Sequence, residues 1–226
     1  VCSSDLKQRV VGGLPMSQEF SKMLVATEET TTRRKSGLTR DRLIVAAAKV
    51  VGRVGYDKAS SSRIAEEAGI AAGGLYYHFE NRQALLNELL PALGEQMVAY
   101  VVSRIEKLPW GLEREVASFR AYLEYLMNNP EFYRVFSEAP VYVPVAYANN
   151  FEATLRDFEA GLRAQCRKGF LKVREEDLTL ATHFLTGIRN YVSQMYQNGQ
   201  ARNSPLEIDD AVNLYRQLLS EGLFKT

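Results

Sequence analysis

Apolar residues recur every three or four positions along most of the chain after Thr39, which is the spacing of one face of an α-helix. Thr39 can cap such a helix at its N-terminus, and Gly55 stands where a left-handed residue often closes one. The pattern therefore predicts a helix over residues 39–54, whose apolar face consists of Leu43, Ala47, Val50, Val51 and Val54.

Two short helices are predicted next. The serines at residues 60–62 offer caps for a helix over Arg63–Ala68, and a glycine-containing turn leads from it into Leu75–Phe79. Asn81 can cap a longer helix that starts near Arg82. Two short helices joined by such a turn, after a longer first helix, describe a helix-turn-helix. Its small core would consist of Ile64, Ala65, Ala68, Ile70, Leu75 and Phe79.

The rest of the chain also has helical periodicity, interrupted by prolines. Pro91 is expected to bend the helix that starts near Arg82, and Pro109 to end its continuation. Gly169 ends a long helix, and the acidic residues 175–177 open the next one, as the helix dipole favours. The predicted helices are Leu112–Asn128, Pro130–Phe136, one between Pro144 and Lys168, Leu178–Gln197 and Leu206–Leu223, with breaks at Pro140 and Pro144. The chain is thus predicted to be all-α.

Composition excludes several classes of protein. With 46% hydrophobic and 24% charged residues and a net charge of +1, the chain does not have the composition of a disordered one. Its longest apolar run, Leu43–Val51, contains Lys49 and has half of the roughly 20 residues that a membrane-spanning helix needs. Cys2 and Cys166 are too few for a disulfide framework, and two histidines are too few for a multi-histidine metal site. We expect a cytoplasmic protein with no membrane segment, metal or cofactor.

Residues 1–37 are expected to form a disordered extension that is partly foreign to the natural protein. Val1–Leu6 can be back-translated into a sequence that resembles the end of a common sequencing-library adapter, so we expect translation to begin at Met16 or Met23. From Thr27 to Gly37 the chain is polar. We interpret this stretch as a flexible basic arm that carries Arg33, Arg34 and Lys35.

Positive charge is concentrated around the predicted helix-turn-helix. Residues 31–82 contain ten basic and five acidic residues, a net charge of +5, which leaves −4 for the rest of a chain whose total is +1. A basic segment on a nearly neutral chain is expected of a module that binds phosphates.

Several segments of this region stand together at fixed spacing: Gly55-Tyr56, Ile64-Ala65-Glu66-Glu67-Ala68-Gly69-Ile70, Gly73, Leu75-Tyr76-Tyr77-His78-Phe79 and Leu85-Leu86. Together they resemble the DNA-binding domain of the tetracycline-repressor (TetR) family. The resemblance implies a three-helix DNA-binding domain over residues 38–90, with its helix-turn-helix at residues 60–79. It also implies a C-terminal helical domain over residues 91–226 that dimerises and binds a small effector.

By this resemblance, the second and third helices contact DNA. Ser60 and Ser61 correspond to phosphate contacts, although the same hydroxyls can serve as helix caps alone. Arg82 stands where the family has a lysine that grips the DNA backbone. The third helix offers Tyr76, Tyr77 and His78, the last of which can instead be a surface residue that packs on its own helix.

The third helix departs from the family pattern at small residues. Ala71 replaces a common capping serine, Ala72 replaces a frequent lysine, and Gly74 replaces a residue with a side chain. These changes are either drift in a short helix or a way for the backbone around Gly73 to approach DNA closely, with Ala72 against a thymine methyl group. Because few side chains remain for base edges, we expect discrimination by DNA shape and by the basic arm in the minor groove.

The predicted helix over Leu178–Gln197 is apolar on more than one face, so it must be buried from two sides. By resemblance, this helix and the last one form the dimer interface. The expected interface residues are Leu185, Ile188, Val192, Ile208, Val212, Tyr215 and Leu219.

Seven of the 29 residues from Pro130 to Phe158 are aromatic, which indicates either an aromatic core or an apolar effector pocket with a few polar groups. Arg189 needs a partner in its apolar helix, either an acidic ligand or one of Glu138, Glu152 and Asp157. The expected ligand contacts are Phe136, Tyr142, Tyr147, Phe151, His183, Thr186, Arg189 and Asn190.

The sequence contains no nucleophile elbow, phosphate-binding loop, metal-ligand cluster or dinucleotide fingerprint, so we do not expect an enzyme. The expected function is a cytoplasmic, homodimeric transcriptional repressor. Its third helices would enter successive major grooves of a near-palindromic operator in double-stranded DNA, and a small apolar or aromatic effector would change their spacing. Two alternatives stay open: a helical small-molecule-binding protein whose DNA-binding segment is weakened, and an activator of the same fold.

Overall fold

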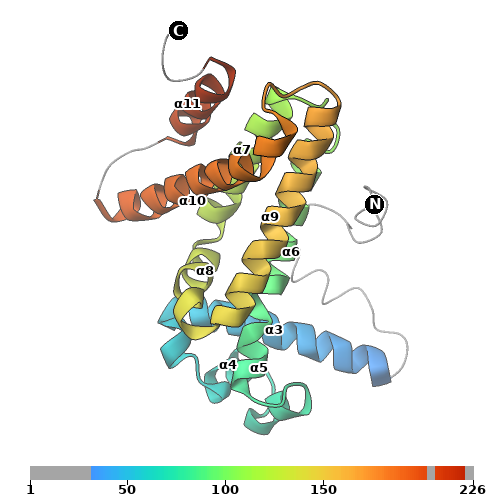
Figure 1. Ribbon diagram of the computed structural model, residues 1–226. Coiled ribbons are helices and arrows are strands. Elements are labelled where there is room, and N and C mark those ends of the chain that lie inside the picture. Colours follow the sequence, from blue (N-terminus) through green and yellow to red (C-terminus); the bar gives the residue numbers. More distant parts are fainter. Residues whose placement is uncertain (1–31, 203–206, 222–226) are drawn as a thin grey trace. The chain divides into compact units, whose positions relative to one another are not determined.

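The computed structural model describes residues 32–202 and 207–221, with the side chains of residues 39–196 and 207–221 (Figure 1). Within these ranges the chain is helical and contains no β-strand, which confirms the predicted all-α fold. Packing divides the described residues into two units, one of residues 32–103 and Glu131–Ala146, the other of Arg104–Pro130 and the residues from Tyr147 onwards. The predicted boundary after residue 90, between a DNA-binding and a C-terminal domain, stays a prediction.

The first unit begins with α3 (Thr32–Lys58), which is longer than the predicted helix. Thr39 therefore lies inside the helix rather than at its start. Gly55 interrupts α3 with φ 83° and ψ 165°, a backbone conformation that only glycine adopts without strain. The predicted apolar face is buried at Leu43, Ala47, Val50 and Val51, and partly buried at Val54.

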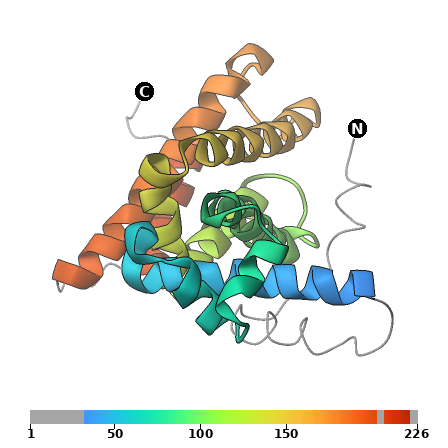
Figure 2. The ribbon, with the colours of Figure 1, turned by 90° about the horizontal axis from the view of Figure 1, so that it is seen from below.

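Three short elements follow α3: α4 (Ser61–Glu67), the 3₁₀-helix η1 (Ala72–Tyr77) and α5 (Arg82–Asn87). The α4 helix packs against α3 and η1, and α5 packs against α3, which Figure 2 shows from the side of these short elements. The predicted small core is confirmed for the buried residues Ile64, Ala65, Ala68, Leu75 and Phe79, while Ile70 is only partly buried.

The interruption predicted at Pro91 is confirmed, because the helix that starts at Arg82 is broken just before this proline. The α5 helix ends at Asn87, Glu88 follows as its cap, and α6 (Leu89–Ile105) begins just before Pro91. Proline has no N–H to donate to the carbonyl four residues before it, and its ring clashes with the preceding turn, so Pro91 fits the first turn of α6 and not the interior of one continuous helix.

The α8 helix (Pro130–Tyr142) belongs almost wholly to the first unit and continues past its predicted end at Phe136. Pro140 lies inside α8, so the break predicted there is wrong. The α8 backbone approaches α3 closely, because a Cβ on Gly52 would lie 2.8 Å from the Cα of Glu131. This contact joins a later segment of the chain to the N-terminal helices.

The second unit is organised around α7 (Leu112–Asn128), whose bounds are those predicted. Packed on α7 are α10 (Leu178–Arg202) and α11 (Ile208–Ser220). Two further elements complete the unit: most of α9 (Pro144–Arg167), ended by Gly169 with φ 78°, and the short η2 (Glu175–Asp177), which opens α10 as predicted. The core of the unit consists of Val116, Phe119, Leu123, Tyr196, Val212 and Tyr215.

None of the helices that the structure describes combines the length and the apolar character needed to cross a bilayer. Among the same residues, no cluster of three or more histidine, cysteine or acidic side chains has an arrangement suited to a metal ion.

Candidate nucleic-acid interface

Short polar side chains cap the helices on both sides of the helix-turn-helix. The Oγ of Ser60 accepts a hydrogen bond of 3.3 Å from the backbone N–H of Arg63 at the start of α4. The Oδ1 of Asn81 accepts one of 2.8 Å from the N–H of Ala84 at the start of α5. Gly69, with φ 67°, turns the chain after α4. The caps predicted at Ser60 and Asn81 are thus confirmed.

The third element, η1, is a 3₁₀-helix rather than the α-helix expected. Ala71 provides no side-chain cap, and glycines at residues 73 and 74 lower the helix propensity. The exposed small residues of η1 are not required by packing, because a Cβ on Gly73 would meet no atom within 4 Å. The backbone from Ala71 to Gly73 is therefore open to close approach by a partner.

Two tyrosines dominate the surface at the end of η1. The side chain of Tyr77 is 90% exposed and that of Tyr76 is 57% exposed, whereas His78 is half-buried. The Tyr76 hydroxyl donates a hydrogen bond of 3.3 Å to the Oγ of Ser61, which ties η1 to the first turn of α4. Nearly all of the Tyr77 side chain therefore lies at the surface of the first unit.

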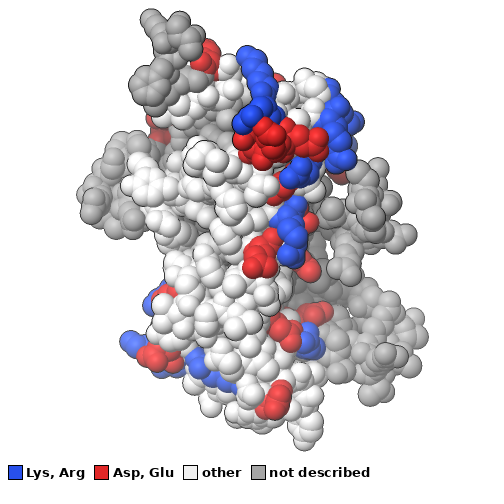
Figure 3. Space-filling view, viewed as in Figure 1, with Lys and Arg blue, Asp and Glu red and all other residues white. Residues whose placement is uncertain are grey.

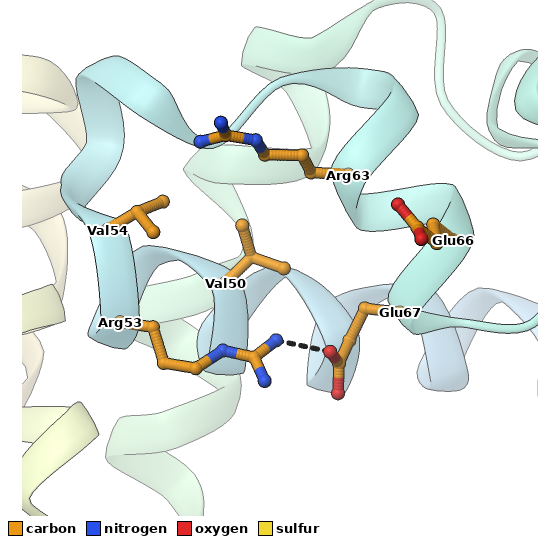
Figure 4. Close-up of a pocket in the computed structure, with 6 residues that line it drawn as sticks. All are labelled: Val50, Arg53, Val54, Arg63, Glu66 and Glu67. Carbon is orange, nitrogen blue, oxygen red and sulfur yellow. Dashed lines mark hydrogen bonds and ion pairs between the residues drawn. The ribbon is translucent and has the colours of Figure 1, made fainter.

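Two of the basic residues counted in this region form ion pairs. Arg40 pairs with Glu88, and Arg53 pairs with Glu67. Figure 4 shows Arg53 and Glu67 facing each other in a hollow that four more residues line: Val50, Val54, Arg63 and Glu66. On the face seen in Figure 3, acidic and basic side chains lie side by side. The count of +5 already includes Glu67, whereas Glu88 lies outside the counted residues and offsets one further positive charge next to Arg40.

Further arginines of the segment are bonded to backbone carbonyls. Arg42 donates to the carbonyl oxygen of Ala68 at 2.7 Å, and Arg63 donates to that of Lys58 at 3.0 Å. These contacts add side-chain donors to carbonyl groups at the ends of α4 and α3.

Arg82, expected to grip the DNA backbone, is also bonded within the protein. Its Nε donates to the carbonyl oxygen of Ala59 at 2.6 Å, and an Nη donates to that of Tyr56. Its side chain is half-buried at the junction of α3, α4 and α5. Sequence reasoning missed this role, since both acceptors lie more than twenty residues away along the chain.

The flexible basic arm is only partly within the described residues. Residues 1–31 lie outside them, whereas residues 32–37 form the first turns of α3. The expectation of a flexible arm is therefore wrong for Arg33, Arg34 and Lys35, which lie in the first turns of α3. Arginine and lysine have a high helix propensity, which favours this extension of α3 towards the N-terminus. Their side chains are outside the description, so their entry into a minor groove stays a prediction.

Glu138 of α8 anchors the end of α3. One carboxylate oxygen accepts the backbone N–H of Tyr56 at 3.0 Å, and the other accepts the Nε–H of Arg134 at 2.7 Å. Burial alone would raise the pKa of Glu138, but these hydrogen bonds outweigh it, so the pKa lies below its usual value. The ring of Tyr142 stacks on that of Tyr56 at 5.5 Å, which strengthens the same junction.

The expected effector contacts do not all belong to one unit. Phe136 and Tyr142 are in the first, and the other six are in the second. Within the second unit, Tyr147 stacks on Phe151 at 6.1 Å. The side-chain oxygen of Asn190 accepts a hydrogen bond from the Tyr122 hydroxyl at 3.2 Å, whereas Thr186 is half-buried and His183 is exposed. Their shared role in binding an effector stays a prediction.

Arg189 has an acidic protein partner, but the acids named as candidates are the wrong ones. Its Nη2 donates to a carboxylate oxygen of Glu115 at 2.7 Å, and both side chains are buried. Glu138 bonds Arg134 instead, and Glu152 pairs with Arg156. A usable signal was present, since Glu115 lies four and seven residues before Phe119 and Tyr122, on the buried face of α7.

The Glu115–Arg189 pair is part of a larger buried group. The Tyr215 hydroxyl donates to the same oxygen of Glu115 at 2.8 Å, and the Arg189 guanidinium lies 4.7 Å from the centre of the Phe158 ring. Burial would lower the pKa of Arg189, but the charge of Glu115 raises it, so the guanidinium stays charged. Its Nε–H is buried without an acceptor in the described part of the chain.

The expected dimer residues lie mostly inside the second unit. Val212 and Tyr215 are each only 2% exposed, so they cannot form an intersubunit contact. Leu185, Ile188, Val192 and Ile208 pack partly buried against the same core, because these faces of α10 and α11 meet α7. Leu219 is exposed, as are the apolar residues of another face of α10: Leu180, Phe184, Tyr191 and Met195.

These elements define an all-helical protein with an N-terminal helix-turn-helix. Residues 43–89 match the model of the family described as bacterial regulatory proteins, tetR family. A relative from Bacillus subtilis, the uncharacterized HTH-type transcriptional regulator YvdT, is 33% identical over 29% of this chain and 32% of its own length. The probable acrEF/envCD operon repressor of Escherichia coli is 31% identical over 37% of this chain and 40% of its own.

The chain thus spans about a third of the length of the curated relatives it matches. Likeness in fold extends further. The transcriptional regulator FadR from Bacillus subtilis, solved in complex with stearoyl-CoA, is similar to this chain with a TM-score of 0.66. That comparison covers 81% of this chain and 98% of the other, at 19% sequence identity.

Proposed function

We propose that this protein is a ligand-responsive transcriptional repressor that binds a near-palindromic operator in double-stranded DNA as a homodimer. The observation that carries the proposal is the exposed Tyr77 at the end of η1, in a helix-turn-helix whose preceding backbone is open to close approach. Because its target is chromosomal DNA, the protein would act in the cytoplasm.

The proposed DNA contacts combine backbone approach with a few side chains. Ser60 and Ser61 would contact phosphates, and the segment from Ala71 to Gly74 would lie against the groove wall. Tyr76, Tyr77 and His78 would reach sugars and base edges. Because η1 offers few groups for paired hydrogen bonds to bases, recognition would depend on DNA shape.

The proposed dimer uses the exposed face of α10 rather than the face that packs on α7. Phe184 and Tyr191 are 65% and 66% exposed and lie seven residues apart, so they share one side of the helix. Leu214 and Leu219 of α11 are exposed as well. An exposed apolar surface of this kind marks a contact with another subunit.

The proposed effector is a small apolar molecule that contacts the second unit. The aromatic pair Tyr147 and Phe151 and the buried Nε–H of Arg189 would supply an apolar wall and one polar contact. The stearoyl-CoA bound to the similar FadR structure supports an effector with a long apolar part.

The test of DNA binding uses the full chain and the DNA upstream of its own gene, titrated over a series of salt concentrations. Wild-type protein should bind this fragment at least about a thousandfold more tightly than random DNA of equal length. Tyr77→Ala should abolish most of that preference. Phe170→Ala, which removes an exposed aromatic side chain of the second unit, is the matched control and should retain it.

Equal binding to upstream and random DNA, at every salt concentration, would reject the regulator and favour a small-molecule-binding protein. A promoter–reporter assay then separates repression from activation. Deleting the gene should raise expression from its own promoter, and a fall in expression would instead indicate the activator.

The dimer is tested by sedimentation of the full chain. Tyr191→Glu should convert a dimer into a monomer, because it places a charge in the apolar contact. Val141→Glu, at an exposed apolar residue of the first unit, should leave the dimer intact. A dimer that survives Tyr191→Glu and Phe184→Glu together would show that subunits meet elsewhere.

A further inference from the structure

Arginine side chains bond the turn between α3 and α4 at three backbone carbonyls. Arg82 donates to the carbonyl oxygens of Tyr56 and Ala59, and Arg63 donates to that of Lys58. The carbonyl oxygens of Tyr56 and Lys58 also accept the backbone N–H groups of Ala59 and Ser60, at 3.4 and 3.0 Å, so the arginines add a second donor to a turn that is already hydrogen-bonded. Arg82 therefore fixes the conformation of this turn from the first residue of α5.

The contact depends on the shape of the guanidinium group. Its Nε and Nη atoms point in fixed directions, so one side chain reaches two carbonyl oxygens that belong to different residues. A lysine ammonium is a single centre on a flexible stem and cannot hold the same two acceptors in a fixed geometry. A substitution can therefore keep the positive charge at residue 82 and remove the paired hydrogen bonds that hold the turn.

Residues that face the proposed DNA partner follow directly after this turn. Ser60 caps α4, and Ser61 in its first turn accepts the hydrogen bond from the Tyr76 hydroxyl. A shift of the turn would move Ser61, and with it the exposed end of η1.

We propose that Arg82 is a positioning residue, which sets the geometry of the DNA-binding segment through the α3–α4 turn, and not the phosphate contact that its place in the family pattern suggests. This inference rests on the proposed DNA-binding function. The Nε and one Nη of Arg82 already donate to the carbonyl oxygens of Ala59 and Tyr56, and the Arg82 side chain is half-buried.

The test compares Arg82→Lys with Arg82→Gln in the full chain, on the operator fragment and on random DNA. If Arg82 is a positioning residue, both variants should lose about tenfold in operator affinity, since neither side chain can donate to both carbonyl oxygens in the same geometry. Binding to random DNA should fall less, so the specificity ratio falls as well. The slope of log affinity against log salt should be unchanged in Arg82→Lys, which keeps the charge.

A phosphate contact predicts the opposite pattern. Arg82→Lys would bind like the wild type, while Arg82→Gln would lose affinity for all DNA alike and lower the salt slope by about 0.9. That result would overturn the proposal. Arg63→Lys is the matched control, because Arg63 makes a single bond to Lys58 that an ammonium can replace. All affinities are measured well below each variant's melting temperature, so that unfolding does not lower the measured affinity.

Amide hydrogen exchange on the protein without DNA tests the same contact independently of the proposed function. Arg82→Lys should speed exchange at residues 59–64, around the turn and the start of α4, while exchange in α7 stays as in the wild type. Unchanged protection at residues 59–64 would overturn the positioning role. A protein that shows this change but no specific DNA binding would retain the positioning role and lose the proposed function.

Discussion

The two units of the molecule differ in how deeply their charged side chains are buried. In the first unit, arginines bond backbone carbonyls at helix ends, as Arg42 does at Ala68 and Arg82 does at Ala59. In the second unit, Arg189 and Glu115 are buried as a pair in the aromatic core. Arginines bond backbone carbonyls in the second unit as well, as Arg114 does at Leu108, so the difference lies in the buried ion pair of the second unit.

The two units also differ in which apolar side chains they bury and which they expose. The N-terminal helices of the first unit bury nearly all of their aliphatic residues in a small core and expose tyrosines at one edge. The second unit leaves Leu180, Phe184 and Tyr191 exposed on α10 while it buries an ion pair. The exposed apolar face of α10 is the surface that the proposed dimer uses, and the first unit has exposed apolar residues of its own at Val141 and Val145.

The largest expected effect comes from breaking the buried ion pair. Glu115→Ala leaves the Arg189 guanidinium and the Tyr215 hydroxyl buried without their shared acceptor, and should lower the free energy of unfolding by about 3–5 kcal/mol. Urea unfolding of the full chain measures this loss.

The combined variant Glu115→Leu, Arg189→Met, Tyr215→Phe is the control for that prediction, because it replaces the whole polar group with apolar side chains. It should recover most of the stability lost by Glu115→Ala. If Glu115→Ala alone unfolds at the same urea concentration as the wild type, the second unit does not depend on its buried charges and the contrast between the units fails.

A second prediction concerns the backbone contact in the first unit. Gly52→Ala places a Cβ 2.8 Å from the Cα of Glu131, so α3 and α8 must separate, and the free energy of unfolding should fall by about 1–3 kcal/mol. Gly161→Ala in α9 is the matched control. Its Cβ meets no atom within 4 Å, and alanine should stabilise the helix by up to about 1 kcal/mol. Thermal melts that rank the two variants the other way would contradict the close approach.

Removing one helix cap should have a smaller effect. Ser60→Ala deletes the hydroxyl that accepts the Arg63 N–H, which should cost about 1 kcal/mol in the free energy of unfolding. Ser62→Ala, at an exposed neighbouring serine, should change it by less than about 0.5 kcal/mol. Equal melting temperatures for the two variants would show that the cap contributes nothing to stability.

The smallest effect is expected from the acid titration of Glu138. Its pKa is lowered in the folded protein by Arg134 and the Tyr56 N–H, so it stabilises the fold above the ordinary carboxyl pKa, and this contribution is lost as pH falls through the lowered value. The stability difference between wild type and Glu138→Gln should therefore shrink as the solution is acidified from neutral pH. If urea unfolding shows that this stability difference stays constant as the pH is lowered, the titration of Glu138 does not contribute to stability.

Local patterns in the sequence were enough to predict most of the helices. The periodicity of α7 predicted both of its ends, and Ser60 and Asn81 marked the helix starts that they cap. These features depend on residues within about four positions of each other, which is the range of a helical turn. The spacing of residues 64–79 was sufficient to indicate the TetR-type domain that the comparison with known families supports.

Tertiary structure alone decided which partner each charged or apolar side chain would meet. Arg189 pairs with Glu115, 74 residues away, and Arg82 bonds the carbonyls of Tyr56 in α3 and of Ala59 in the turn after it. Likewise, the apolar pattern of α10 has two faces, and only packing on α7 determines that Leu185 and Ile188 are covered while Phe184 and Tyr191 remain exposed. Periodicity shows that a helix has an apolar face, but which surface covers that face depends on how distant helices pack together.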